Sequence, residues 1–193
     1  MRIVYFVAAV AFTAACAQSG DAIDTTRANP VDSPRLNRTA DTTQTAATDQ
    51  CVRGEPEPAL DPAVKAVFQR RSKIEATEDA RVADTLSLLI RHGGCAHFSE
   101  VYAFTITGAA NNNTADSQRW LRLGAQLLRR LNVVDVKKSQ MEEMAGALEK
   151  AADATPPYTY GDPLSVSEMV TLYVTARPVR TGVVMEITYD NTL

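Results

Sequence analysis

Histidine and cysteine, the residues most able to bind a metal ion or to act in catalysis, gather in one short segment of this 193-residue chain. Its two histidines, His92 and His97, both lie within three residues of Cys95. Imidazole and thiolate groups are common zinc ligands, so a metal site is the first interpretation that this segment raises.

The flanking residues argue against a metal site. Apolar residues on both sides of the segment fall at even-numbered positions. This pattern predicts a hairpin that pairs even residues with even, with Ile90 opposite Phe98 and a loop over 93–95. Side chains alternate across a strand, so His92 would face the core and His97 the other side. We therefore expect no metal, and the chain contains no recognisable cofactor-binding motif.

The N-terminal residues are typical of an export signal. Arg2 supplies a positive charge, and residues 3–15 contain no charged side chain. As a helix these residues would span about 20 Å, which is too short for a bilayer core of about 30 Å. A short apolar run between a positive residue and small residues instead predicts a secretory signal peptide over residues 1–15.

The end of this segment, Thr13-Ala14-Ala15-Cys16, resembles the lipobox of bacterial lipoproteins, although Thr13 stands where the family usually has leucine. The resemblance implies that Cys16 is lipidated and becomes the first mature residue. Ala17 after it implies the outer membrane of a Gram-negative cell. The alternative is an A-x-A cleavage site at Ala15-Cys16-Ala17, which would leave a soluble periplasmic or secreted protein.

Residues 16–50 form a spacer rich in threonine, alanine and aspartate, with few large aliphatic residues and no aromatic ones. Such a composition predicts a disordered tether. Both interpretations of the signal consume Cys16, so Cys51 and Cys95 remain as one pair in an oxidising compartment. We expect them to form a disulfide that fastens the start of the folded domain, 51–193.

The region 51–193 shows the periodicities of a single α+β domain. We expect a two-layer sandwich, in which an antiparallel sheet of about four or five strands packs on a helical hairpin, with a short N-terminal helix added. The strands pair as two hairpins, the second with Val174 opposite Met185. The expected helices cover 62–71, 115–132 and a segment from Ser139, and the expected strands cover 73–78, 82–92, 97–107, 170–177 and 183–190.

The two longer expected helices carry opposite charges. Residues 115–132 place arginines on one face, whereas the following helix exposes Glu142, Glu143 and Glu149. The simplest interpretation is a hairpin whose surfaces attract each other weakly. The alternative is an arginine patch that docks an acidic partner.

Composition and motifs exclude some functions. The chain has 20 Lys and Arg against 23 Asp and Glu, a net charge of -3, whereas nucleic-acid binders usually have a basic excess. No nucleotide-binding, metalloprotease or serine-hydrolase motif is present. Glu100 shares the apolar face of its expected strand with Phe98 and Tyr102. It is therefore a charge at the sheet rim, a buried carboxylate bonded to an arginine, or a catalytic acid of raised pKa.

These features lead us to expect an envelope-tethered, non-enzymatic binding module. Its architecture resembles small periplasmic lipoprotein inhibitors and toxin-neutralising immunity proteins. The resemblance implies that it neutralises a periplasmic or cell-wall-acting protein, that it reaches the membrane only through the lipid anchor, and that it binds no nucleic acid. The expected binding surface is the polar sheet face with Thr171, Tyr173 and Thr175, or the hairpin tip with His97.

Two alternative functions remain open. The first is a structural accessory subunit of a cell-envelope assembly. The second is a hydrolase with an unrecognised site, which requires a concave pocket around Glu100 and His92 that holds at least two further polar groups.

Overall fold

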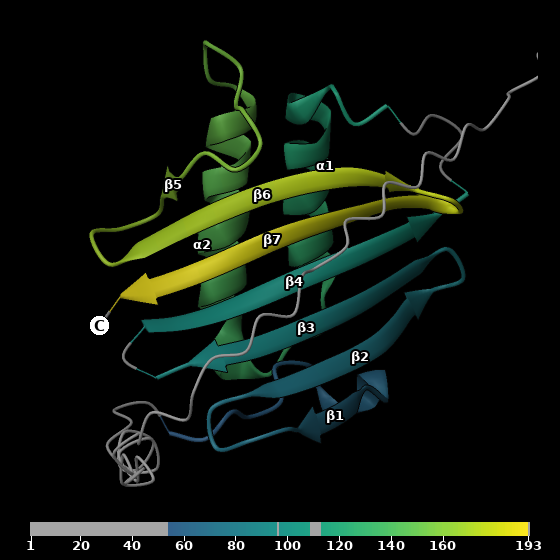
Figure 1. Cartoon of the computed structure of the whole chain (residues 1–193), viewed down its shortest axis with the longest axis vertical. Coiled ribbons are helices and arrows are strands. Elements are labelled where there is room, and N and C mark those ends of the chain that lie inside the picture. Colours follow the sequence, from purple (N-terminus) through teal and green to yellow (C-terminus); the bar gives the residue numbers. More distant parts are fainter. Residues whose placement is uncertain (1–53, 96, 109–112, 193) are drawn as a thin grey trace, which may run out of the picture. The chain divides into compact units, whose positions relative to one another are not determined.

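Seven strands among the described residues form one antiparallel sheet in the order β1-β2-β3-β4-β7-β6-β5 (Figure 1). The structure is a computed structural model that describes residues 54–95, 97–108 and 113–192, all within the unit Ala40–Leu193. The strands are β1 (Val67–Arg70), β2 (Ala76–Ala83), β3 (Leu86–Gly94), β4 (His97–Thr107), β5 (Leu164–Ser165), β6 (Val170–Val179) and β7 (Gly182–Thr192).

Helices α1 (Ser117–Arg130) and α2 (Asp135–Ala152) lie side by side against one face of the sheet (Figure 1). The chain is therefore an α+β protein, as its periodicities predict. None of the helices in the described part of the chain is long and apolar enough to cross a membrane. The largest fully buried side chains of the core come from both helices and from the sheet, and include Trp120, Leu121, Leu128, Met144, Leu148, Phe104, Met185 and Ile187.

Alternation along the strands separates the two faces of the sheet. Ile90 and Tyr102 are fully buried under the helices, whereas the odd-numbered residues beside them point the other way. We call the side beneath α1 and α2 the covered face and the other side the open face. From β6 towards β3, the open face carries Thr171, Tyr173, Thr175, Thr188, Glu186, Val101 and Arg91.

The even-with-even pairing of β3 and β4 is confirmed, but its register differs from the prediction. Ile90 lies opposite Tyr102, and Phe98 pairs with Gly94 instead. β3 continues to Gly94 because this glycine adopts φ 95°, and a Cβ there would lie 1.9 Å from a carbonyl oxygen of β4. The predicted loop over 93–95 is therefore wrong.

The hairpin of β6 and β7 shows the same behaviour. Val174 lies opposite Ile187, two residues away from the predicted partner Met185. All three side chains are fully buried, so the face on which each residue lies is as predicted. A shift of two residues moves the partner along the strand without changing its face.

The predicted helix over 62–71 is wrong beyond its first turn. Pro62–Val64 form a 3₁₀ helix whose N-cap is Asp61. Lys65 ends this helix with a left-handed φ of 56°, and the chain continues as β1 from Val67. Valine and phenylalanine at the start of β1 favour an extended strand, and pairing with β2 fixes that conformation.

The expected number of four or five strands is also wrong, because the sheet extends further at both edges. The short strands β1 and β5 leave no clear periodicity in the sequence. β2 covers Ala76–Ala83 where we predicted 73–78, and β3 starts only at Leu86 because a turn separates it from β2. α2 begins at Asp135, before the predicted start at Ser139.

Ion pairs join the two helices, as their opposite charges predict. An Arg122 guanidinium nitrogen lies 2.9 Å from the Asp153 carboxylate. Arg129 binds Glu142 at 3.0 Å and also binds Glu149. These side chains are substantially exposed, so each pair stabilises the hairpin only weakly.

Candidate functional site

Charged side chains from three adjacent strands lie buried together on the covered face. Glu78 on β2, His92 on β3 and Glu100 on β4 have exposed fractions of 1%, 3% and 0%. His92 and Glu100 are direct cross-strand neighbours. A buried ionised group is costly unless another group pairs with it, so these residues need partners inside the core.

Glu100 is the centre of this group, and side chains from the sheet and from α2 bind both of its oxygens. Lys137 Nζ donates to Oε1 at 2.6 Å, and His92 Nδ1 lies 3.2 Å from the same oxygen. The Tyr102 hydroxyl and Gln140 Nε2 donate to Oε2 at 2.9 and 2.7 Å. Lys137 and Gln140 stand three residues apart near the start of α2, so one carboxylate fastens this end of the helix to β4.

Glu78 has a similar role for the segment that precedes β1. Its carboxylate accepts the Ala59 N–H at 2.8 Å and the Leu60 N–H at 3.2 Å. His92 Nε2 lies 3.8 Å from Glu78 Oε2 and makes no hydrogen bond, so this contact acts through charge. His92 therefore stands between two carboxylates. We call the set Glu78, His92, Glu100 and Lys137 the buried charge cluster.

The surroundings of His92 and Glu100 shift the pKa of each group in the direction that favours its charged form. Burial acts to lower the pKa of His92, but the hydrogen bond with Glu100 and the charges of Glu100 and Glu78 outweigh it and raise that pKa above 6.5. Burial acts to raise the pKa of Glu100, but the bond with His92 and the charge of Lys137 lower it well below its usual range. Burial and the Glu100 charge raise the pKa of Tyr102, which therefore stays a hydrogen-bond donor.

The structure distinguishes between the predictions made for these residues. His92 faces the core and His97 faces the other side, as the strand alternation predicts. Glu100 is a buried carboxylate, as one of the alternatives predicts, and its cationic partners among the described residues are Lys137 and His92. Its lowered pKa is the reverse of what a catalytic acid needs. Within the described ranges, no group of His, Cys, Asp or Glu residues is arranged to hold a metal ion.

A pocket of about 420 Å³ adjoins the cluster at the start of α2. Glu100 and Lys137 contribute to its lining, and Arg70 reaches it from β1, where it binds Glu55. His92 is not part of the lining. The described residues that line this pocket are Gly54, Glu55, Glu57, Pro58, Arg70, Glu100, Val134, Val136 and Lys137.

Charged side chains line this pocket, but the buried charge cluster supplies it with no acid or base whose hydrogen bonds are free. Both oxygens of Glu100 accept hydrogen bonds, and the side chain of His92 has an exposed fraction of 0%. Lys137 is the cluster member that reaches the surface, with 17% of its side chain exposed. The arrangement can hold a polar ligand, whereas proton transfer would require bonds of Glu100 to break first.

The residues predicted to bind a partner lie together on the open face. Thr171, Tyr173 and Thr175 alternate with the buried residues of β6. His97 points to the same face at the start of β4, where its Nδ1 lies 3.4 Å from the Thr192 hydroxyl. A second pocket, of about 450 Å³, lies on this face over the three strands at the other edge. It is lined by Val67, Gln69, Arg71, Glu75, Thr77, Asp79, Leu89 and Arg91.

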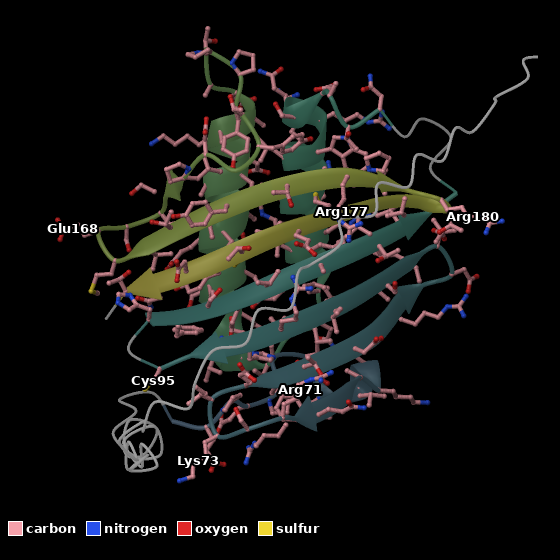
Figure 2. The ribbon with its side chains drawn as sticks, viewed as in Figure 1. Arg71, Lys73, Cys95, Glu168, Arg177 and Arg180 are labelled. Atoms are coloured by element: carbon pink, nitrogen blue, oxygen red, sulfur yellow. The ribbon has the colours of Figure 1, made fainter. Side chains whose placement is uncertain are left out.

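Cys95 marks the turn between β3 and β4, at one end of the sheet (Figure 2). Cys95 is disulfide-bonded. The predicted partner Cys51 and the predicted lipid carrier Cys16 both lie outside the described residues. The pairing of Cys51 with Cys95 and the lipidation of Cys16 therefore stay predictions.

Sequence reasoning missed Glu78, Lys137 and Gln140. Glu78 could have been found, because it continues the even-numbered series of buried residues between Ala76 and Ala80 on β2. Lys137 and Gln140 have the spacing of one helix face, but nothing in the sequence connects that face with a strand 37 residues earlier. Comparisons with protein-family models, with curated proteins and with solved structures find no match to this chain.

Proposed function

We propose that this chain is an envelope-tethered, non-enzymatic binding module that recognises another protein through the open face. The observation that supports the proposal is the contrast between the two faces of the sheet. On the covered face, His92 and Glu100 are buried, and Glu100 is bonded to both His92 and Lys137. The open face carries Thr171, Tyr173 and Thr175, and the Tyr173 hydroxyl makes no hydrogen bond to any residue that the structure describes.

The form of the domain suits this role. In the proposal the helices are a supporting layer and the sheet is the layer that meets the partner. A sheet with a packed core behind it loses little conformational entropy when it binds. Tyrosine supplies a large contact area with few rotatable bonds, and it is enriched among the residues that dominate interfaces. An inhibitor or immunity-type protein would use such a surface to neutralise a periplasmic or cell-wall-acting protein.

The binding test uses the mature full-length protein as bait in envelope extract, followed by identification and purification of the captured protein. We expect the combined Thr171→Ala, Tyr173→Ala and Thr175→Ala variant to weaken the affinity by about tenfold or more. Gln126→Ala, on the exposed side of α1, is the matched control and should leave the affinity unchanged. Equal affinities for the two variants would contradict the proposal.

We also propose that a lipid on Cys16 attaches the protein to the outer membrane and that residues 16–50 act as its tether. The support is the export segment over 1–15 and its lipobox-like end. Mass analysis of the mature N-terminus tests this part separately. A Cys16 that carries acyl chains is the expected result, and a free N-terminus at Gln18 would show the alternative cleavage.

A hydrolase is the second candidate function, and the pocket that Glu100 and Lys137 line is the observation in its favour. It predicts turnover of a small polar substrate that Lys137→Met abolishes while far-ultraviolet circular dichroism stays unchanged. Lys138→Met, one residue along the same helix, is the control and should retain full turnover. The saturated bonding of Glu100 makes us prefer the binding function.

A further inference from the structure

The two edges of the sheet differ in how their main-chain groups are used. Beside β6, the Val170 carbonyl accepts the Val166 N–H at 3.0 Å, and the Val174 carbonyl accepts the Gly161 N–H at 3.1 Å. The Val174 N–H in turn donates to the Tyr158 hydroxyl at 3.2 Å. Beside β1, no described residue makes a backbone hydrogen bond to the outer edge. Among the described residues, the sheet is therefore protected at one edge and open at the other.

One hydrogen bond identifies the groups at the open edge. The Arg71 N–H donates to the Glu75 carbonyl at 2.9 Å, across the turn between β1 and β2. Bonded pairs alternate with non-bonded pairs in an antiparallel ladder, so Gln69 and Val67 also turn their main-chain groups towards β2. The N–H and C=O groups of Phe68 and Arg70 consequently point outwards from the sheet.

This edge is also locally basic in a chain whose net charge is -3. Residues 65–73 contain Lys65, Arg70, Arg71 and Lys73, and no aspartate or glutamate. Lys65 and Arg71 make no ion pair with any residue that the structure describes, whereas the arginines Arg122 and Arg129 on α1 are paired with α2. Figure 2 shows Arg71 and Lys73 on the β1 side of the sheet, away from Arg177 and Arg180.

We propose that the outer edge of β1 binds an extended acidic segment of a partner protein, which joins the sheet as a further strand. The main-chain groups of Phe68 and Arg70 would supply the ladder of hydrogen bonds, as in other cases of strand addition. Arg71 would select a carboxylate in the incoming segment. Side chains alternate between faces, so the residues between such carboxylates would lie on the side of Phe68.

The positions of the charges favour this occupant over a second copy of the chain. Glu75 lies on the β2 side of Arg71. A carboxylate that approaches from the outer side of β1 therefore reaches Arg71 before it reaches Glu75. Two copies paired through β1 would bring their own cations together, and like charges on neighbouring strands destabilise a sheet. Lysine and arginine at an edge are a common device against such self-pairing.

The inference concerns an edge of the sheet and goes beyond the proposed function, which concerns the face around Tyr173. The probe is a fluorescent eight-residue peptide that alternates valine with glutamate, and the comparison peptide replaces each glutamate with lysine. Binding to the full-length protein is followed by anisotropy at low salt. We expect only the glutamate peptide to bind, and Arg71→Glu to weaken it by about tenfold. Arg177→Glu, an exposed arginine on β6, is the charge control and should change its binding less than about twofold.

A second pair of variants tests the hydrogen bonds of the edge. Arg70→Pro removes an outward N–H without breaking the ladder to β2, and Arg70→Ala removes the same side chain but keeps that N–H. We expect Arg70→Pro to bind the glutamate peptide about fivefold more weakly than Arg70→Ala does. In the wild-type protein, the peptide should also slow amide hydrogen exchange at Phe68 and Arg70. Because this hydrogen-exchange measurement uses the wild-type protein, its result does not depend on whether a variant folds.

Three results would overturn the inference. The lysine peptide could bind as tightly as the glutamate peptide, or exchange at Phe68 and Arg70 could be unaffected when the peptide is bound. Sedimentation could instead show dimers that Arg70→Pro dissociates, which would make a second copy the occupant. Unchanged partner binding in Tyr173→Ala, with peptide binding intact, would contradict the proposed function and leave the inference standing, so the two proposals can fail separately.

Discussion

His92 and Arg91 are consecutive residues of β3, yet their side chains enter different environments. His92 points to the covered face and lies between Glu78 and Glu100, with no exposed side-chain surface. Arg91 points to the open face and reaches Glu186 at 3.3 Å, where the two side chains are 43% and 29% exposed. Each residue forms a pair of a cation with a carboxylate, so burial is the main difference between the two pairs.

This difference shows how one sheet can separate stability from recognition. On the covered face every charge has a fixed partner, because an unpaired charge there would cost several kcal/mol, on the order of 3–5. On the open face water compensates for a lost partner, so residues there can change without loss of the fold. Predictions that compare substitutions on the two faces test this separation directly.

The largest effect is expected from Glu100→Ala. It leaves Lys137 and His92 as uncompensated cations beside the core and should lower the free energy of unfolding by about 3–5 kcal/mol. Glu186→Ala removes the carboxylate of the matched pair on the open face and should cost about 0–1 kcal/mol. Urea denaturation of both variants measures the difference. Equal losses would mean that burial does not distinguish the two pairs.

A smaller loss is expected from Lys137→Met, which removes one charged donor from Glu100 and keeps the length of the side chain. Hydrogen bonds to charged groups contribute about 1.5–3 kcal/mol, and we expect a loss in that range in urea. Lys138→Met removes the exposed pair with Asp135 on the same helix and should leave the denaturation midpoint unchanged. A midpoint shift as large as that of Lys137→Met would contradict the comparison.

The pH dependence of stability is the third test. The pKa of His92 is raised above 6.5 in the folded state, so its proton stabilises the fold fully below about pH 6.5 and this contribution is lost as the pH rises through the raised value. The lowered pKa of Glu100 acts at the other end, where its contribution is lost as the pH falls below 4.5 towards the folded value. Between pH 6 and 9, we expect unfolding free energies to fall less in His92→Gln than in wild type. Parallel curves would show that His92 does not titrate against Glu78 and Glu100.

The sequence predicts which face a residue occupies better than it predicts the neighbour of that residue. Even-numbered residues in the middle of β3 and β4 are buried as expected, and those near the strand ends are partly buried. His92 and His97 separate as expected. The register is different, because shifts by two or four residues preserve the pattern of faces and only the turn selects among them. Gly94, through its positive φ, ends β3 two residues later than predicted and so allows the register that places Ile90 opposite Tyr102.

The candidate site was only partly predictable for a related reason. The apolar neighbours of Glu100 mark it as a residue of the covered face, but its partners come from elements far apart in the chain. Lys137 lies before the predicted start of its helix at Ser139, so the sequence pattern did not place it on a helix at all. Pro62 does start a helix, but that helix lasts for one turn only. Because we predicted a longer helix from this signal, we missed the short strand β1.

The smallest change in stability is expected from Tyr173→Ala, and this prediction separates the faces most sharply. Tyr173 lies opposite Thr188 on the open face, so its removal leaves no cavity in the core and should cost about 1 kcal/mol or less. The same substitution should nevertheless weaken the affinity for the captured partner by about tenfold. Urea denaturation and partner titration on one protein sample give both quantities. If Tyr173→Ala instead loses stability and retains its affinity, the open face serves folding and not recognition. Binding would then be independent of the residue at the centre of the proposed surface.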